Sequence, residues 1–600
     1  SHFDRREVIQ AVAQDSTAGM RPAEVTAATN AALATDQVVD LGTEHRFAGP
    51  IYSTVEMIEL EAKLLQIAER SQPNSRAVCD TARVERAIAD RPTLSAEQQH
   101  MVRHLCRSGD GVLVVVGRAG TGKTFALDAC RQAWTSCGVT VIGAALAART
   151  AAGLQAGTGI PSTTVDQLLA DLGRPGSQAV LPRGGVLVVD EAGMVGTRKL
   201  AAVVAAAERY HTKLVLVGDP RQLPEIEAGG AFAALAQASG VELTENRRQA
   251  NTWERQALAQ LRHGDVGHAV AVYREHGRIT LAPTAEEARS RLVEDWWAAR
   301  DPGRRDRAVM IALHQADVDE LSARARDRLD AAGQLRGPEL EAANNKRFAA
   351  GDEILTLRND RRLGVTNGTR AQITRVDVEN RSVTATTADG HQVTITGEYI
   401  DAGHLTHGYA LTAHKAQGIT VERALVLGTD RLYREAGYTS LSRATQRTDL
   451  YHVAPPQVAW QPRADPHAQL TANLSRSAAQ TLATDHIGAR NPDNRSDLTA
   501  IRDAALADPG QHLIDRLGPP PPAGREREMW AAAATAIDAY RNRYAIAGLD
   551  WLGPRPDQAA QVDRESHVEQ IRAYEHAEAL ARQVERHIDL TVEPHLGIGR

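Results

Sequence analysis

The sequence is poor in aromatic residues and cysteine, and it contains no long apolar run. Phe, Trp and Tyr together make up 4% of the 600 residues. No stretch of about 18 apolar residues occurs, so we expect no membrane insertion, and no signal peptide is visible. The four cysteines show no Cys-x-x-Cys or Cys/His metal spacing, which indicates buried thiols in a reduced, cytoplasmic compartment.

The charge balance gives no sign of a broadly basic surface. The chain has 69 Lys and Arg against 75 Asp and Glu, a net charge of −6. Binding to nucleic acid would therefore depend on local grooves rather than on the field of the whole protein. An apolar fraction of 42% supports well-sized cores, and the length predicts roughly three to five domains.

The pattern of apolar segments predicts an α/β protein. We expect a helical region over 1–90, a first doubly wound parallel α/β domain over 91–250, a second over 251–455, an irregular linker over 456–524, and a helical region over 525–600. The strands expected in the two α/β domains are Val112–Val116, Val139–Ile142, Val186–Val189, Leu214–Val217, Ala308–Leu313 and Ala424–Leu427.

Residues 350–400 have a different character. Short alternating segments there are separated by Asn367-Gly368 and Asp389-Gly390, dipeptides that favour tight hairpin turns. The expected strands are Asp352–Leu357, Arg370–Val376, Ser382–Thr387 and Gln392–Thr396. This stretch is therefore predicted to be a small β-barrel-like insertion in the second domain.

A complete phosphate-binding loop follows the first predicted strand. Its sequence is Gly117-Arg118-Ala119-Gly120-Thr121-Gly122-Lys123-Thr124, and a helix-like stretch begins directly after it. Backbone N–H groups of such a glycine-rich turn can cradle phosphates. Lys123 can reach the β- and γ-phosphates, and the Thr124 hydroxyl can bind Mg²⁺. The sequence therefore predicts ATP and Mg²⁺ as cofactors.

Two carboxylates end the predicted strand Val186–Val189. Asp190 is expected to bind Mg²⁺, and Glu191 to orient and activate the attacking water as a general base. After the next strand, Gln222 lies where a neutral side chain could contact both the γ-phosphate and that water. Gln98 precedes the phosphate loop and could contact the adenine edge, although Ser95-x-x-Gln98 also fits a simple helix capping box.

Three further motifs indicate which class of ATP-binding protein the chain resembles. They are Gly218-Asp-Pro-Arg-Gln-Leu223, Leu411-Thr-Ala-His-Lys-Ala-Gln-Gly418 and Tyr438-Thr-Ser-Leu-Ser-Arg443. In this order, residues 93–455 resemble the superfamily 1 helicases, specifically the RecD-like branch that moves 5′ to 3′ on DNA. The β-rich insertion resembles the small SH3-like barrel of that branch, and the two α/β domains would be RecA-like motor domains.

The resemblance implies roles for further residues. Arg248 and Arg443 would stabilise charge on the transferred phosphoryl group, and Gln417 and Gly418 would link the ATP and DNA sites. The residues expected to contact single-stranded DNA are Arg149, Thr163, Thr412 and His414. For Thr163 and Thr412, a helix cap or turn hydroxyl is an alternative of nearly equal weight.

A finer resemblance is to the helicase part of conjugative relaxases of the MobF/TraA type. It rests on the segments Gly143–Leu154, Gly159–Val165, Asp190–Met194 and Ala316–Leu321. Many RecD-like enzymes have Pro-Thr where this chain has Leu146-Ala147, so Arg149 would take over part of the contact with the DNA backbone.

The nicking half of a relaxase needs a His-x-His metal site, and the sequence contains none that we would assign to it. The pair His404-x-x-His407 is expected to serve structure or DNA contact, so we expect no DNA nicking by residues 1–600.

The expected partners are single-stranded DNA and duplex DNA with a 5′ tail, together with an upstream relaxase domain and the conjugation machinery. A free-standing RecD-like repair helicase is the alternative enzyme. A decayed single-strand-binding module is the alternative from another class, and intact Lys123, Asp190 and Glu191 argue against it. The segment Arg174–Gly185 is interpreted as a duplex-splitting hairpin or a plain loop.

Overall fold

The fold is described from a computed structural model of the chain. It describes residues 2–15, 19–43, 49–71, 76–174, 181–225, 227–301, 304, 307–387, 390–453, 465–490, 502, 505–506, 509–522, 525–543, 551–552, 574, 577–578, 581–582 and 584. Within these ranges, no helix has both the length and the apolar character needed to cross a membrane. The chain forms two compact units, Ser1–Thr484 and Asp485–Arg600.

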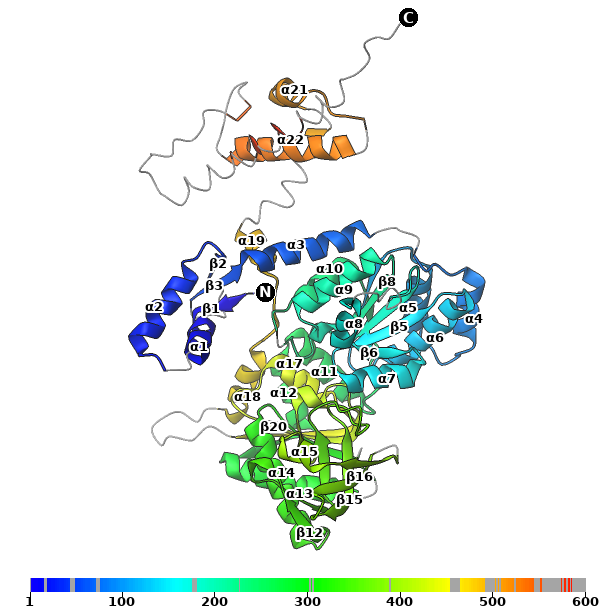
Figure 1. Ribbon diagram of the computed structural model, residues 1–600, viewed down its shortest axis with the longest axis vertical. Helices are drawn as coiled ribbons and strands as arrows, with labels where there is room; N and C mark the ends of the chain where they lie inside the picture. The colour runs from blue at the N-terminus through cyan, green and yellow to red at the C-terminus, as the bar shows by residue number, and fades with distance from the viewer. Residues whose placement is uncertain are drawn as a thin grey trace, which may run out of the picture. The chain divides into compact units, whose positions relative to one another are not determined.

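The first α/β domain is built on a six-stranded sheet in the order β6-β5-β7-β8-β4-β9 (Figure 1). Every neighbouring pair is parallel. The strands are β4 (Val112–Gly117), β5 (Val141–Ala145), β6 (Ser162–Thr164), β7 (Val186–Asp190), β8 (Lys213–Gly218) and β9 (Gly240–Leu243). The sheet is therefore the doubly wound type expected from the sequence, with β5 beginning two residues later than predicted.

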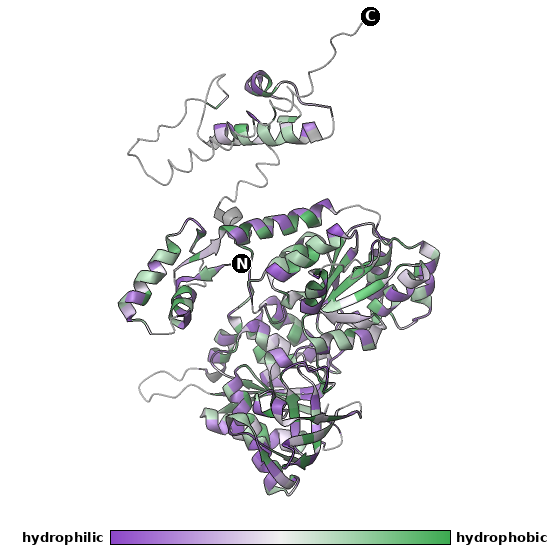
Figure 2. Cartoon of the chain, viewed as in Figure 1, coloured by the Kyte–Doolittle hydropathy of each residue, from purple (hydrophilic) through white to green (hydrophobic). Residues whose placement is uncertain are grey.

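Alternate residues of these strands pack into two separate cores. Val115 and Val188 face the core formed with α4 (Thr81–Ala89), α5 (Ala96–Arg107) and α6 (Lys123–Ser136). Val114 and Val189 face the opposite core, which includes side chains of the helices α3 (Val55–Arg70), α9 (Thr197–Arg209) and α10 (Ala231–Ser239). Burial on both faces explains why these strands are continuous apolar runs, the interior green strands of Figure 2.

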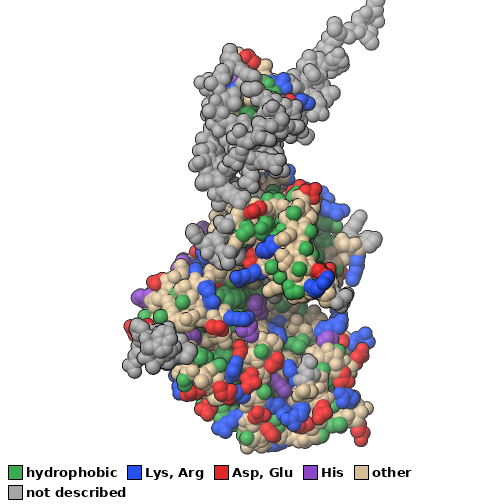
Figure 3. All heavy atoms as spheres, turned by 90° about the vertical axis from the view of Figure 1, so that its left-hand side faces the viewer, with side chains coloured by type: hydrophobic (Ala, Val, Ile, Leu, Met, Phe, Trp, Pro, Cys, Tyr) green, Lys and Arg blue, Asp and Glu red, His purple; other side chains and the backbone are tan. Residues whose placement is uncertain are grey.

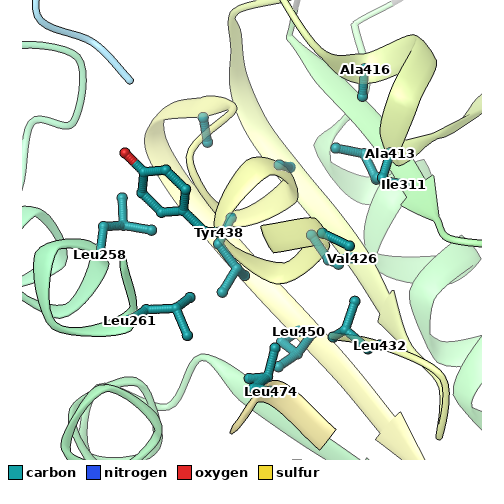
Figure 4. Close-up of a cluster of buried hydrophobic side chains, with 14 of the residues drawn as sticks. Leu258, Leu261, Ile311, Ala413, Ala416, Val426, Leu432, Tyr438, Leu450 and Leu474 are labelled. Carbon is teal, nitrogen blue, oxygen red and sulfur yellow. The ribbon is translucent and has the colours of Figure 1, made fainter. Parts of the chain in front are cut away.

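The second α/β domain has a five-stranded parallel sheet in the order β10-β21-β20-β11-β19. Its strands are β10 (Ile279–Ala282), β11 (Ala308–Ala312), β19 (Ala410–Thr412), β20 (Val421–Gly428) and β21 (Ala444–Val453). One face packs on α13 (Ala285–Ala299) and α14 (Gln315–Ala331). The other packs on α11 (Thr252–His263), α12 (Val266–Glu275), α17 (Arg434–Leu441) and α18 (Pro466–Ser475), and Figure 4 shows part of this core.

An antiparallel insertion interrupts this second domain between β11 and β19. It contains a five-stranded sheet in the order β17-β16-β15-β14-β18 and a two-stranded ribbon, with a core of its own. The strands are β12 (Arg336–Glu341), β13 (Arg347–Ala350), β14 (Glu353–Thr356), β15 (Arg370–Asp377), β16 (Ser382–Thr387), β17 (Gln392–Ile395) and β18 (Leu405–His407). The β-rich segment predicted over 350–400 is therefore observed, but it extends further at both ends.

The N-terminal region was predicted to be helical, and that prediction is wrong in part. Besides α1 (Arg5–Asp15), α2 (Pro22–Leu33) and α3 it contains a three-stranded antiparallel sheet, β1-β3-β2. The strands are β1 (Phe3–Asp4), β2 (Val38–Thr43) and β3 (Pro50–Thr54). They are short and carry few apolar residues, so they lack a clear alternating pattern.

The prediction of an irregular linker over 456–524 is also wrong in part. The described residues there include α18, α19 (Ala483–Arg490) and α21 (Gln511–Leu517). Leu470 and Leu474 of α18 are buried in the second-domain core. Half of the segment proposed as a splitting hairpin, residues 175–180, lies outside the described residues.

The chain then runs back to the first domain through residues 475–484, which we call the return segment. The Gln480 amide accepts from the N–H of Gly229 at 2.6 Å and donates to the carbonyls of Glu225 and Glu227 at 3.0 and 3.2 Å. Leu482 is fully buried in the first-domain core beside α3 and α10. The return segment therefore connects the two α/β domains a second time.

In the C-terminal unit, α22 (Arg525–Arg543) and α21 surround a small core. Trp530 and Tyr540 are 1% and 3% exposed there, and the Trp530 indole donates to the Gly518 carbonyl at 2.9 Å. These aromatic residues are buried within their own unit. Beyond Arg543, most of the helical region predicted over 525–600 lies outside the described residues.

The return segment can be tested by removing its buried leucine. Leu482→Ala should lower the free energy of unfolding of the first unit by about 2–4 kcal/mol, because it leaves a cavity in a closed core. Val378→Ala, at a side chain that is 46% exposed, should change it by less than about 0.5 kcal/mol. Urea unfolding of both variants is the measurement, and equal midpoints would show that Leu482 is not packed as described.

Candidate nucleotide site

The phosphate loop joins β4 to α6 and depends on glycine for its shape. Gly120 and Gly122 have φ angles of 82° and 70°, in the left-handed region that favours glycine. A Cβ atom on Gly120 would lie 2.6 Å from the Asn246 Oδ1 and from the Arg248 Cβ. The close approach of residues 246–248 therefore requires glycine here, and the Arg247 N–H donates to the Gly120 carbonyl at 2.9 Å.

A cleft of about 420 Å³ lies over this loop and is lined by both α/β domains. The predicted site residues that it brings together are Gly120, Thr121, Gly122, Lys123, Thr124, Arg149, Asp190, Glu191, Gln222, Arg248, Gln417, Gly418 and Arg443. Gly117 lies at the base of the loop, where its carbonyl accepts from Lys123 Nζ at 3.0 Å.

The carboxylate pair ends β7 in a sharp turn. Glu191 has a φ angle of 51°, a left-handed conformation that is rare for a residue with a side chain, and its N–H donates to Asp190 Oδ1 at 2.9 Å. Burial and the neighbouring Glu191 carboxylate raise the pKa of Asp190 to about 6, although Lys123 acts in the opposite direction. The Gln417 amide of the second domain donates to Glu191 Oε2 at 3.1 Å.

These residues fit a magnesium–nucleotide complex. Thr124 and Asp190 line the same cleft and offer the oxygen donors that Mg²⁺ prefers. Gln417 Oε1 is buried and has no hydrogen-bond partner among the described residues, as expected for an acceptor that meets a bound group.

Two arginines bring positive charge to the same cleft. Arg443 is 2% exposed, and burial together with the Arg248 charge lowers its pKa to about 9. Its Nη2 lies 3.5 Å from Gln222 Oε1, and Arg248 Nη1 donates to the Ser442 carbonyl at 3.0 Å. Two neighbouring guanidiniums in a buried cleft favour an anionic ligand such as a phosphate.

Gln98 lies beneath the loop and does not line the cleft. It completes the capping box with Ser95 at the start of α5, so that alternative is confirmed. Its Nε2 also donates to the Thr121 carbonyl at 2.9 Å. Contact with adenine stays a prediction.

Glu97 is a residue that the sequence analysis missed. Its carboxylate accepts from the N–H groups of Thr244 and Glu245 at 2.7 and 3.0 Å, and so fixes the segment that leads to Arg248. No local pattern reveals a contact that spans about 150 residues of chain.

The residues predicted to contact DNA lie in different surroundings. Arg149, near the start of α7 (Ala148–Thr158), lines the phosphate cleft itself. Thr163 lies in β6 at the edge of the first sheet. Thr412 caps α16 (Ala413–Ala416) by accepting from the Lys415 N–H at 3.3 Å, so the cap alternative is observed, and His414 lies in that helix. Their contact with DNA stays a prediction.

The pair His404 and His407 has structural contacts. His407 is buried, with Nε2 3.0 Å from the Arg347 carbonyl, and His404 Nε2 lies 3.2 Å from Arg358 Nη1. Among the residues that the structure describes, no cluster of three or more His, Cys, Asp or Glu side chains could bind a metal ion.

Two parallel α/β domains that meet over a glycine-rich phosphate loop define a P-loop nucleotide-binding protein. Residues 93–284 match the family described as AAA domain. The chain is homologous to the TraA conjugal transfer proteins and to the RecD helicases, which confirms the resemblance to RecD-like superfamily 1 helicases that its motifs indicate.

The relatives differ in how much of their length is matched. The probable conjugal transfer protein TraA of Sinorhizobium fredii is 36% identical over 413 residues, which are 67% of this chain and 36% of that protein. The ATP-dependent RecD2 DNA helicase of Deinococcus radiodurans is 29% identical over 412 residues, or 66% of this chain and 53% of the helicase. The chain thus spans little more than a third of the TraA proteins.

A solved structure of Pif1 helicases, studied for DNA unwinding at forked duplex DNA, also aligns with this chain. The alignment covers 60% of this chain and 92% of the Pif1 chain. The TM-score is 0.42 at 20% sequence identity, and a similarity at this level supports no functional argument.

The raised pKa of Asp190 predicts a specific dependence of stability on pH. Between about pH 3.9, the usual value for Asp, and pH 6 the folded state binds more protons than the unfolded state, so the free energy of unfolding falls as the pH rises. Between pH 5 and pH 7.5, the free energy of unfolding of the wild type should fall by about 1 kcal/mol more than that of Asp190→Asn, because an Asn side chain at this position cannot titrate. Urea unfolding without nucleotide or Mg²⁺ measures this, and parallel pH profiles would contradict it.

Proposed function

We propose that this chain is an ATP-dependent motor that moves 5′ to 3′ on single-stranded DNA and unwinds duplex DNA. The observation that carries the proposal is the shared cleft: Lys123 and the carboxylate pair come from the first domain, and Arg443 and Gln417 from the second. A site that is complete only when both domains meet favours ATP-driven opening and closing.

Each group in the cleft has a role in phosphoryl transfer. Lys123 and the loop N–H groups bind the phosphates, and bound Mg²⁺, held by Thr124 and Asp190, would neutralise charge on the phosphate oxygens. Glu191 accepts a proton from the attacking water, and Gln222 orients that water. The two arginines stabilise the charge that develops on the γ-phosphoryl group.

We propose that single-stranded DNA crosses the two domains and is bound mainly through its phosphates, at Arg149, Thr163, Thr412 and His414. On the face that Figure 3 shows, basic and acidic side chains are interspersed rather than gathered by sign. Local contacts would then supply the affinity for single-stranded DNA. This affinity should depend little on the base sequence and should fall as the salt concentration rises.

The cellular role that we propose is plasmid DNA transfer, with this chain as the motor half of a conjugative relaxase. The similarity to TraA proteins favours it over the RecD-like repair helicase, because the TraA relatives are 36–37% identical and the RecD relatives 28–31%. We further propose that the motor domains are RecA-like, with boundaries near residues 91, 250 and 455, and that the antiparallel insertion is an SH3-like barrel.

The first test is ATP hydrolysis with and without single-stranded DNA. Single-stranded DNA should raise the rate of ATP hydrolysis by the wild type at least tenfold. The Lys123→Ala variant should hydrolyse ATP about 100-fold more slowly, because the phosphates lose a charged ligand within a desolvated cleft. Lys63→Ala, at an exposed lysine of the same unit, is the matched control. Turnover that ignores DNA would indicate a switch ATPase, and DNA binding without turnover a decayed binding module.

The direction of movement needs a separate experiment. Duplexes with a 5′ or a 3′ single-stranded tail should differ, with ATP-dependent strand separation from the 5′-tailed substrate only. Glu191→Gln should bind nucleotide and DNA but separate strands at least 100-fold more slowly, because it lacks the general base. Preference for the 3′-tailed duplex would refute the assigned polarity while leaving the motor activity in place.

A further inference from the structure

A buried tyrosine hydroxyl connects the second α/β domain to the phosphate loop of the first. Tyr438 lies in α17 and is 3% exposed. In Figure 4 its ring lies near Leu258, and its hydroxyl points away from the apolar side chains of the cluster. The hydroxyl oxygen accepts from the N–H of Ala119, a residue of the phosphate loop, at 3.2 Å.

The same hydroxyl donates to Asp219, which follows β8. Tyr438 Oη lies 3.3 Å from Asp219 Oδ2, while Asp219 Oδ1 accepts from Arg262 Nη2 at 3.0 Å and from the Arg221 N–H at 3.1 Å. Burial and the Asp219 carboxylate raise the pKa of Tyr438, so the hydroxyl keeps the proton that it donates. One oxygen atom thus joins the phosphate loop to a buried ion pair.

The next residue of α17 contacts the loop that carries Gln222. Thr439 Oγ1 accepts from the Leu223 N–H at 3.2 Å, and the Thr439 carbonyl accepts from Arg443 Nε at 2.7 Å. The helix that ends just before Arg443 therefore contacts both first-domain loops that surround the reacting phosphate.

We propose that Tyr438 is a positioning residue for ATP hydrolysis, which sets the phosphate loop and the Gln222 loop in register with Arg443 when the two domains meet. This inference rests on the proposed ATPase function. The Ala119 N–H already donates to the Tyr438 hydroxyl, so it is not one of the loop N–H groups left to bind phosphate. Losing this hydrogen bond should therefore affect turnover rather than nucleotide affinity.

The test is Tyr438→Phe, which keeps the ring and removes one oxygen atom. The kcat for ATP hydrolysis should fall about tenfold, because the buried Ala119 N–H loses its acceptor and the aligned arrangement becomes less populated. The KM for ATP should stay within about twofold. Hydrogen exchange should speed up in peptides that cover residues 117–124, a readout that does not depend on activity.

Tyr273→Phe is the matched control. Tyr273 is equally buried in the same core and donates to Glu254, with an O···O distance of 3.4 Å, but no hydrogen bond links it to the phosphate loop. Both variants should lose similar thermal stability, whereas only Tyr438→Phe should change kcat and the exchange of the loop.

Two kinetic outcomes would overturn the inference: a Tyr438→Phe variant that matches Tyr273→Phe, or one with a raised KM and an unchanged kcat. If the wild type hydrolyses no ATP, the proposed function fails by itself. In that case unchanged exchange in residues 117–124 overturns the role of Tyr438, and faster exchange supports it.

Discussion

The arrangement of the molecule depends on charges that are buried where the two α/β domains meet. Asp190, Glu191, Arg248 and Arg443 all line the same cleft. Each like-charged pair is unfavourable alone in a desolvated site, as the shifted pKa values of Asp190 and Arg443 show. The Glu191 carboxylate acts on both arginines, so the two pairs offset each other in part. A ligand that carries both phosphate and metal charge complements both pairs.

Local patterns predicted much of the fold, because the parallel strands are buried on both faces and strands of the insertion such as β16 alternate between more and less buried residues. Strand β16 was predicted at its observed bounds, Ser382–Thr387, and β4 within one residue, since continuous apolar or alternating runs bounded by turn residues carry a strong signal. The N-terminal strands and α18 were missed. The strand β1 has only two residues, which is too short to show a repeat of apolar residues. Helix α18 lies in a polar stretch and buries only a few side chains, such as Leu470 and Leu474.

The candidate site was predictable where chemistry is encoded in consecutive residues, and less so where distant segments meet. The phosphate loop and Asp190-Glu191 could be read directly, but nothing local shows that Glu97 fixes the segment before Arg248. Arg149 is the instructive case. Helix α7 packs closely on the start of α6, since a Cβ on Gly157 would come within 2.5 Å of Thr124 Cγ2, and the helix also brings Arg149 into the lining of the phosphate cleft.

The return segment changes where the boundary of a minimal functional fragment should be drawn. The parallel sheets and the motifs end by residue 453, so sequence alone would suggest trimming the chain there. Such a fragment would lack Leu470 and Leu474 from the second core and Leu482 from the first, and so would expose an apolar hollow in each domain. A truncated protein that aggregates would then report lost packing rather than lost chemistry. A fragment that ends at Thr484, the end of the first compact unit, keeps both cores closed.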